Sequence, residues 1–220
     1  MAANVRFRPE ADIRARWKAG AAETSLITTP ARKRPMRFAI LFAAALTFAG
    51  PVRADAPLEE GFAGALRGCE EWVLHPNSWA NGVAPFVSAV GLGDKMGLVA
   101  QVSDAALPPP ALRVGNHYWR INSTPGAGFI LVVSDQLPMC HITGGGDTDL
   151  QPVVEAVLGA TTFTTRWEKM GEETRGGMIT TTFRNRGQPA LSILVSRART
   201  TGQRQDRVQV LATAIFKTTK

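Results

Sequence analysis

The two cysteines and three histidines of this 220-residue chain are its clearest candidates for chemistry. Cys69 and Cys140 are far enough apart in the sequence to connect distant parts of one fold. Basic residues followed by an apolar run within residues 36–54 indicate export, and two cysteines in an exported chain of this size most often form one disulfide. Closing such a loop stabilises a fold by roughly 4 kcal/mol, because it restricts the unfolded chain. We therefore expect a Cys69–Cys140 disulfide.

A thiol enzyme is the competing hypothesis, with His75, His117 or His141 as the base. Cys69 lies inside an expected helix, away from the amino end where the helix dipole lowers a thiol pKa. Cys140 and His141 are consecutive residues of an expected strand, so their side chains point to opposite faces and cannot form a dyad. Their spacing with Cys69 and His117 matches no zinc motif, and we expect no metal or other cofactor.

Carboxylates offer a second route to an exported hydrolase. In this alternative, a Cys/His or carboxylate site occupies a cleft lined by Trp72, His75, His117 and His141. Glu70 and Glu71 are neighbours on one expected helix and point about 100° apart. We therefore expect a solvated surface at these two residues rather than an acid/base pair.

A glycine-rich segment, Gly144–Asp149, precedes another expected helix. Backbone N–H groups in such a turn can bind an anion, but the segment lacks the Lys and Ser/Thr of a phosphate-binding loop. Asp147 and Asp149 would also repel a phosphate. We expect a turn from a hairpin into the helix, with one Asp capping the helix.

The net charge of +7 belongs entirely to the first 54 residues. Residues 55–220 hold 15 basic and 15 acidic side chains, which removes the electrostatic basis for nucleic-acid binding. Within them, residues 55–155 carry −7 and residues 156–220 carry +7. This division suits one domain whose acidic and basic parts face each other, or a basic binding surface. For a surface that meets anions, the candidate residues are Arg184, Arg186, Arg197, Arg199, Arg204 and Arg207.

Residues 36–54 have the order of a secretory signal peptide: basic residues, an apolar run, then small residues before Asp55. The apolar run of 12 residues would span about 18 Å as a helix, less than the roughly 30 Å core of a membrane. We expect cleavage after Ala54 and a periplasmic or secreted protein without a stable membrane span. The alternative is an inner-membrane anchor formed by residues 38–54. Residues 1–35 are expected to be a disordered extension, or to precede the true start of the chain.

The pattern of residues 55–220 predicts one α+β domain. Apolar residues at three- and four-residue spacing predict a helix over 58–74, and an apolar stretch at 83–90 is compatible with a second short one. Three consecutive prolines mark 105–111 as an extended loop. Strands are predicted over 118–122, 129–134 and 139–143, then a helix over 150–158, then strands over 162–170, 178–184, 190–197 and 208–217.

Short polar loops between these strands predict antiparallel neighbours, with the helices packed on one face of a mainly antiparallel sheet. The predicted order is one helix, three strands, one helix and four strands. We see no internal repeat with the period of a solenoid. The function that this sequence favours is non-enzymatic binding of a protein or envelope component outside the cytoplasm, and an exported hydrolase is the alternative.

Overall fold

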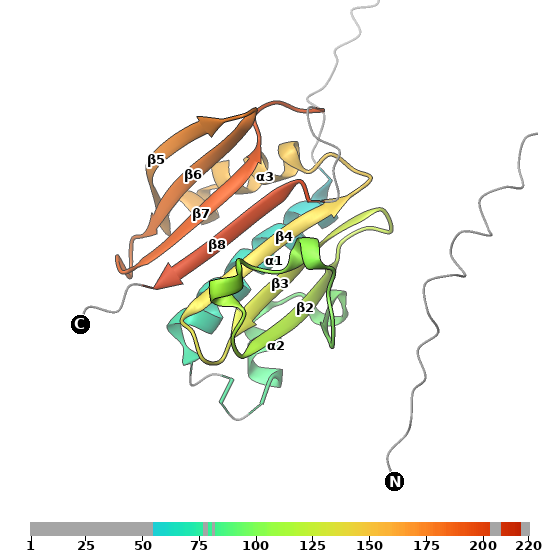
Figure 1. Cartoon of the computed structure of the whole chain (residues 1–220), viewed down its shortest axis with the longest axis vertical. Helices are drawn as coiled ribbons and strands as arrows, with labels where there is room; N and C mark the ends of the chain where they lie inside the picture. Colours follow the sequence, from blue (N-terminus) through green and yellow to red (C-terminus); the bar gives the residue numbers. More distant parts are fainter. Residues whose placement is uncertain (1–54, 77–78, 81, 203–207, 217–220) are drawn as a thin grey trace, which may run out of the picture. The chain divides into compact units, whose positions relative to one another are not determined.

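The computed structural model describes residues 55–76, 79–80, 82–202 and 208–216 (Figure 1). The signal peptide expected over 36–54, the segment before it, and Arg204 and Arg207 lie outside the described residues. Within the described residues, no helix has both the length and the apolar character needed to cross a membrane.

The described helices are α1 (Ala56–Leu74), α2 (Ala84–Val90), α3 (Gln151–Gly159) and α4 (Thr161–Thr164), with short 3-10 turns η3 (Gly93–Lys95), η4 (Asp104–Ala106) and η5 (Pro110–Leu112). The strands are β1 (Met96–Val99), β2 (Asn116–Asn122), β3 (Ala127–Ser134), β4 (Met139–Gly146), β5 (Trp167–Arg175), β6 (Met178–Asn185), β7 (Leu191–Ala198) and β8 (Val210–Phe216). The predicted α+β class, with helices on an antiparallel sheet, is confirmed.

These strands form one antiparallel sheet in the order β1-β2-β3-β4-β8-β7-β6-β5. This order divides the described chain into two halves with the same succession of elements. Each half has two α-helices followed by four strands, and the last strands of the two halves, β4 and β8, pair at the centre. The repeat lies in the topology and has no solenoid period in the sequence.

The core lies between the helices and one face of the sheet, which we call the inner face. Helix α1 packs there against β3 and β4. Its buried residues follow the predicted spacing and include Phe62, Leu66 and Cys69. Gly68 lets the helix approach the sheet closely, since a Cβ at this position would lie 2.9 Å from Cδ2 of Leu131. Strand residues alternate, so every second side chain of β3, β4, β7 and β8 joins this core.

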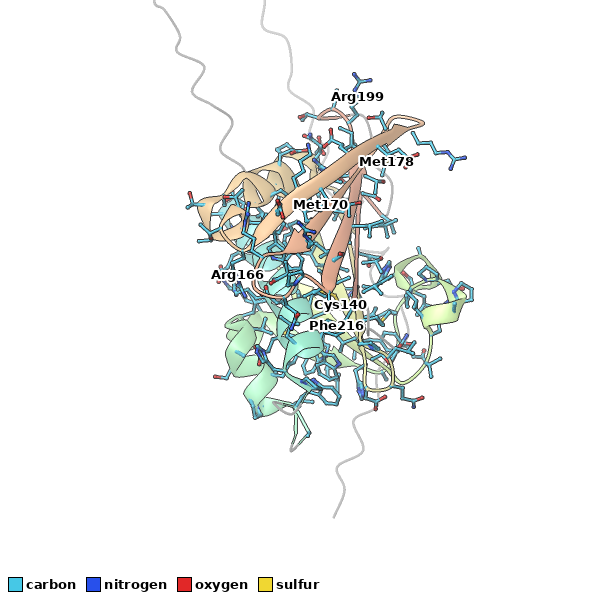
Figure 2. The ribbon with its side chains drawn as sticks, turned by 90° about the vertical axis from the view of Figure 1, so that its left-hand side faces the viewer. Cys140, Arg166, Met170, Met178, Arg199 and Phe216 are labelled. Atoms are coloured by element: carbon cyan, nitrogen blue, oxygen red, sulfur yellow. A yellow bond between two sulfur atoms is a disulfide. The ribbon has the colours of Figure 1, made fainter. Side chains whose placement is uncertain are left out.

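The opposite, outer face of the sheet differs between the two halves. In the first half, residues 100–115 connect β1 to β2 and carry η4 and η5. In the second half, the equivalent connection between β5 and β6 is the tight turn Gly176-Gly177. Figures 1 and 2 show η4 and η5 on the side of the sheet away from α1. We call residues 100–115 the outer segment.

The outer segment buries side chains that would otherwise be exposed on the outer face of β3 and β4. Val132, His141 and Thr143 are each 4% exposed or less. On the second half, Leu194 of β7 and Ile215 of β8 are 41% and 43% exposed. The outer face is therefore covered beside β4 and open beside β7.

Two local predictions need correction, and one strand has no predicted counterpart. The strand expected over 162–170 starts only at Trp167, because α4 occupies Thr161–Thr164 and buries Phe163 against Trp167 and Phe183. The strand then continues to Arg175, through residues expected to form a turn. Strand β1 pairs with β2 at one edge of the sheet and was not predicted.

Candidate functional site

A groove of about 560 Å³ lies on the outer face, where the covered part of the sheet meets the open part. The outer segment forms one wall, and strands β4, β7 and β8 form the floor. This volume falls within the range of small-molecule sites. We call this feature the outer groove; its lining consists of Ala105, Leu107, Pro108, Pro109, Leu112, Arg113, His141, Leu194, Ser196, Leu211, Thr213 and Ile215.

The floor is built by apolar residues at strand positions that would usually be polar. In β7, Leu191, Ile193 and Val195 point to the core, so Leu194 between them points to the outer face. In β8, Leu211 and Ile215 are outward in the same way. Both strands thus carry apolar side chains on both faces, as is typical of a sheet surface that another element or a ligand covers.

The wall is apolar as well, apart from one cation. Leu107 and Leu112 are half-buried, and Pro108 is buried. Arg113 is exposed, and its Nε donates a hydrogen bond to the carbonyl oxygen of Pro108 at 2.7 Å. Arg113 is the only charged residue among those that line the outer groove.

His141 is the buried polar group of the floor. It is 4% exposed, and its Nδ1 lies 2.8 Å from Oγ1 of Thr213, the residue opposite it on β8. Its Nε2 has no hydrogen-bond partner among the described residues. Burial lowers the pKa of His141 to about 4, because a charged imidazole loses its hydration there. The ring is therefore neutral at pH 7.

The disulfide between Cys69 and Cys140 is confirmed, with the two Cα atoms 5.4 Å apart. It connects α1 to β4 on the inner face, whereas His141 points to the outer face. With both sulfurs in this bond, neither cysteine is a nucleophile. The proposed thiol and histidine pair is thus not present in this structure.

The candidate hydrolase cleft does not assemble either. Trp72 is 3% exposed, donates from Nε1 to the carbonyl oxygen of Ser134 at 2.7 Å and stacks on Trp79, so it is a core residue. His117 packs against Trp72 with ring centroids 5.6 Å apart. His75 ends α1 and pairs with Glu71 at 2.9 Å. His141 is separated from all of these by the sheet.

The arginine set that was expected to meet an anionic surface is divided between several environments. Arg197 is 5% exposed on the inner face, where Nε donates to Glu155 and Nη1 to Thr181, both at 2.7 Å. Arg184 pairs with Glu168 at 2.8 Å on the outer face and lowers the pKa of that carboxyl. Figure 2 shows Arg199, which follows β7, beside Met178 at the start of β6. Arg184 and Arg186 lie at the other end of β6.

Ion pairs instead connect the acidic and basic parts of the chain. Glu155 contacts Arg197, and Glu70 contacts Arg166 at 2.7 Å. Glu70 is 8% exposed and also accepts a hydrogen bond from Nδ2 of Asn185 at 3.0 Å. The prediction that Glu70 is solvated is wrong, because Arg166, between α4 and β5, and Asn185 of β6 close over this face of α1.

The glycine-rich segment is strand rather than turn. Gly144–Gly146 are the last residues of β4, and a Cβ at Gly144 would lie 2.5 Å from Cγ1 of Val210. The glycine therefore allows close packing, and its backbone pairs with Phe129 and Val210. The expected Asp cap is wrong in its position, because Leu150 is the N-cap residue of α3 and makes no side-chain cap hydrogen bond. Asp149, one residue earlier, accepts a hydrogen bond from the backbone N–H of Gln151 at 3.0 Å.

The sequence pattern did not predict the outer groove. His141 was grouped with His75 and His117, which lie on the other side of the sheet. Arg113, Leu194 and Ile215 were given no role. The signal for the groove was in the sequence of two strands, Leu191–Val195 and Val210–Phe216. In each of them, apolar residues occur at positions that point to either face of the sheet. Comparison of the chain with protein-family models, curated proteins and solved structures gave no match.

Proposed function

We propose that this protein is an exported, disulfide-stabilised binding protein that holds an apolar ligand in the outer groove. The observation that carries the proposal is the exposure of Leu194 and Ile215 directly beside the apolar wall of the outer segment. Covering such side chains stabilises a complex by about 25 cal/mol for each Å² of apolar surface removed from water. A ligand that fills the groove gains this free energy with little rearrangement, since the sheet and the outer segment already form the floor and wall.

Saturable binding of Nile red, a neutral apolar dye, tests this proposal. We expect its fluorescence to rise on binding to the purified protein and Leu194→Asp to abolish the rise, because a carboxylate would be buried against the dye. Leu98→Asp is the matched control: Leu98 is 54% exposed on β1 and does not line the outer groove. Absence of saturable binding, or an equal loss in both variants, would overturn the proposal.

Export is the second part of the proposal and rests on the signal-peptide pattern at 36–54 together with the disulfide. Intact-mass analysis after expression in a secreting bacterium tests both features. We expect a chain that begins at Asp55 and lacks the two thiol hydrogens. A mass that retains residues 36–54 would contradict cleavage, and alkylation of both cysteines without reduction would contradict the disulfide.

A further inference from the structure

The polar groups that line the outer groove determine which kind of apolar ligand fits it. The inference drawn from them rests on the proposed function. Among the lining residues there is no carboxylate. The hydroxyls of Ser196 and Thr213 already have partners at 2.8 Å, the hydroxyl of Thr180 and Nδ1 of His141 respectively. The polar groups left to meet a ligand are the guanidinium of Arg113 and the imidazole of His141.

Arg113 offers hydrogen-bond donors that are held in place. Its Nε is bonded to the carbonyl oxygen of Pro108, a residue of the same wall. This bond orients the guanidinium plane, while its two amino groups have no protein partner within the described residues. A guanidinium oriented in this way suits a carboxylate, which accepts two parallel hydrogen bonds.

His141 can provide a further hydrogen-bond donor, depending on which of its ring nitrogens carries the hydrogen. If the hydroxyl of Thr213 donates to Nδ1, its hydrogen is used and the neutral ring keeps its own hydrogen on Nε2. The opposite arrangement would leave Nε2 as a buried acceptor without a donor among the described residues, and only the first arrangement offers a hydrogen to a ligand. A buried N–H without an acceptor destabilises the folded protein. A ligand that supplies an acceptor to Nε2 removes that cost.

We propose that the outer groove binds an alkyl carboxylate. Its carboxylate accepts hydrogen bonds from Arg113 and from Nε2 of His141, and its hydrocarbon chain lies over Leu194, Leu211 and Ile215. The charge of the head group complements the single cation of the lining, and the chain covers the exposed apolar floor. A cationic amphiphile of equal chain length would match the floor but meet only donors at its head.

Displacement of Nile red by two amphiphiles of equal chain length tests the inference. Dodecanoate and dodecyltrimethylammonium are used below their micelle concentrations. We expect the protein to bind dodecanoate at least about tenfold more tightly, the effect of one charge-assisted hydrogen bond. Arg113→Glu is expected to reverse this order, and Arg113→Lys to preserve it. Arg120→Glu is the control, since Arg120 is exposed on β2 and does not line this groove.

The role of His141 is tested with His141→Phe, which removes the donor, and His141→Gln, which keeps one. We expect His141→Phe to weaken dodecanoate about tenfold while Nile red binding persists, and His141→Gln to recover part of the loss. The Arg113 variants provide an independent test should the buried position tolerate neither change.

The outcomes separate this inference from the proposed function. Equal affinity for the two amphiphiles, or equal effects of Arg113→Glu and Arg120→Glu, would overturn the proposal that the ligand is an alkyl carboxylate. The proposal that the protein binds an apolar ligand would be unaffected. Tighter binding of a short peptide with an apolar carboxyl-terminal residue would replace the alkyl acid by a peptide terminus. Failure of Nile red to bind would instead remove the proposed function itself.

Discussion

Cys140 and His141 are consecutive residues of β4, yet they serve opposite faces of the sheet. The sulfur of Cys140 is bonded to Cys69 of α1, and the imidazole of His141 lies against Thr213 beneath the outer segment. Because side chains alternate along a strand, the disulfide that anchors β4 to the helix layer also fixes where His141 points. The same strand therefore connects the stability of the core to the geometry of the outer groove.

Removing the disulfide is expected to lower the free energy of unfolding by roughly 4 kcal/mol, because the bond closes a long loop in the unfolded chain. Urea unfolding of Cys69→Ala/Cys140→Ala measures the effect. The wild-type protein under reducing conditions is the control, since it keeps both sulfurs and loses only the bond. If the oxidised wild type and the double variant unfold at the same urea concentration, the bond contributes nothing to stability.

The buried His141 makes stability depend on pH. Its folded-state pKa is about 4, below the ordinary 6.5, so between these values the unfolded chain binds a proton that the folded protein does not. The free energy of unfolding should therefore fall as the pH is lowered from 6.5 to 4. The contribution of this residue, about 3 kcal/mol, is fully retained above pH 6.5.

Urea unfolding across this pH range tests the dependence on His141. We expect His141→Gln to flatten the curve and His75→Gln, a change at an exposed histidine, to leave it unchanged. Parallel curves for the wild type and His141→Gln would show that another group is responsible.

The regular spacing of apolar residues predicted the helices and strands that bury one of their faces. Helix α1 and strands β6 to β8 lie within a few residues of their expected bounds, because burial on one side imposes regular spacing on the sequence. Helix α4 was missed because its threonines favour strands, whereas the packing of Phe163 between Trp167 and Phe183 decides its conformation. Such long-range contacts leave no local pattern.

The candidate site was harder to predict, because its residues come from separate strands and a loop. The wrong grouping of His141 with His75 and His117 followed from residue type alone, without knowledge of which face each side chain occupies. Arg113 follows a proline-rich loop, a position typical of a solvated charge. Only the fold of the outer segment over β4 brings these two residues to one groove.

Gly144 is expected to be intolerant of even a methyl group. An added Cβ would lie 2.5 Å from Cγ1 of Val210 and 2.7 Å from ring atoms of Phe129, and both side chains are buried. Overpacking of this kind typically costs about 1–3 kcal/mol. Thermal unfolding of Gly144→Ala should show the loss. Gly97→Ala, in β1 with open space around its Cβ position, should not lower stability comparably.

Glu70 and Arg166 should be strongly coupled in their effects on the free energy of unfolding, although the pair as a whole contributes little to it. Arg166→Met leaves the buried carboxylate of Glu70 with only Asn185 as a partner, and losing the partner of a buried polar group costs about 1–3 kcal/mol. Adding Glu70→Gln to that variant removes the charge and can keep a hydrogen bond to Asn185. The double variant should therefore be more stable than Arg166→Met alone.

A double-mutant cycle by urea unfolding measures this coupling. The matched control is Glu71→Gln, the same change at the next residue of α1, where the carboxylate contacts the exposed His75. We expect that change to alter stability by no more than about 0.5 kcal/mol. If Glu70→Gln destabilises the Arg166→Met protein further, the carboxylate is stabilised by contacts other than Arg166.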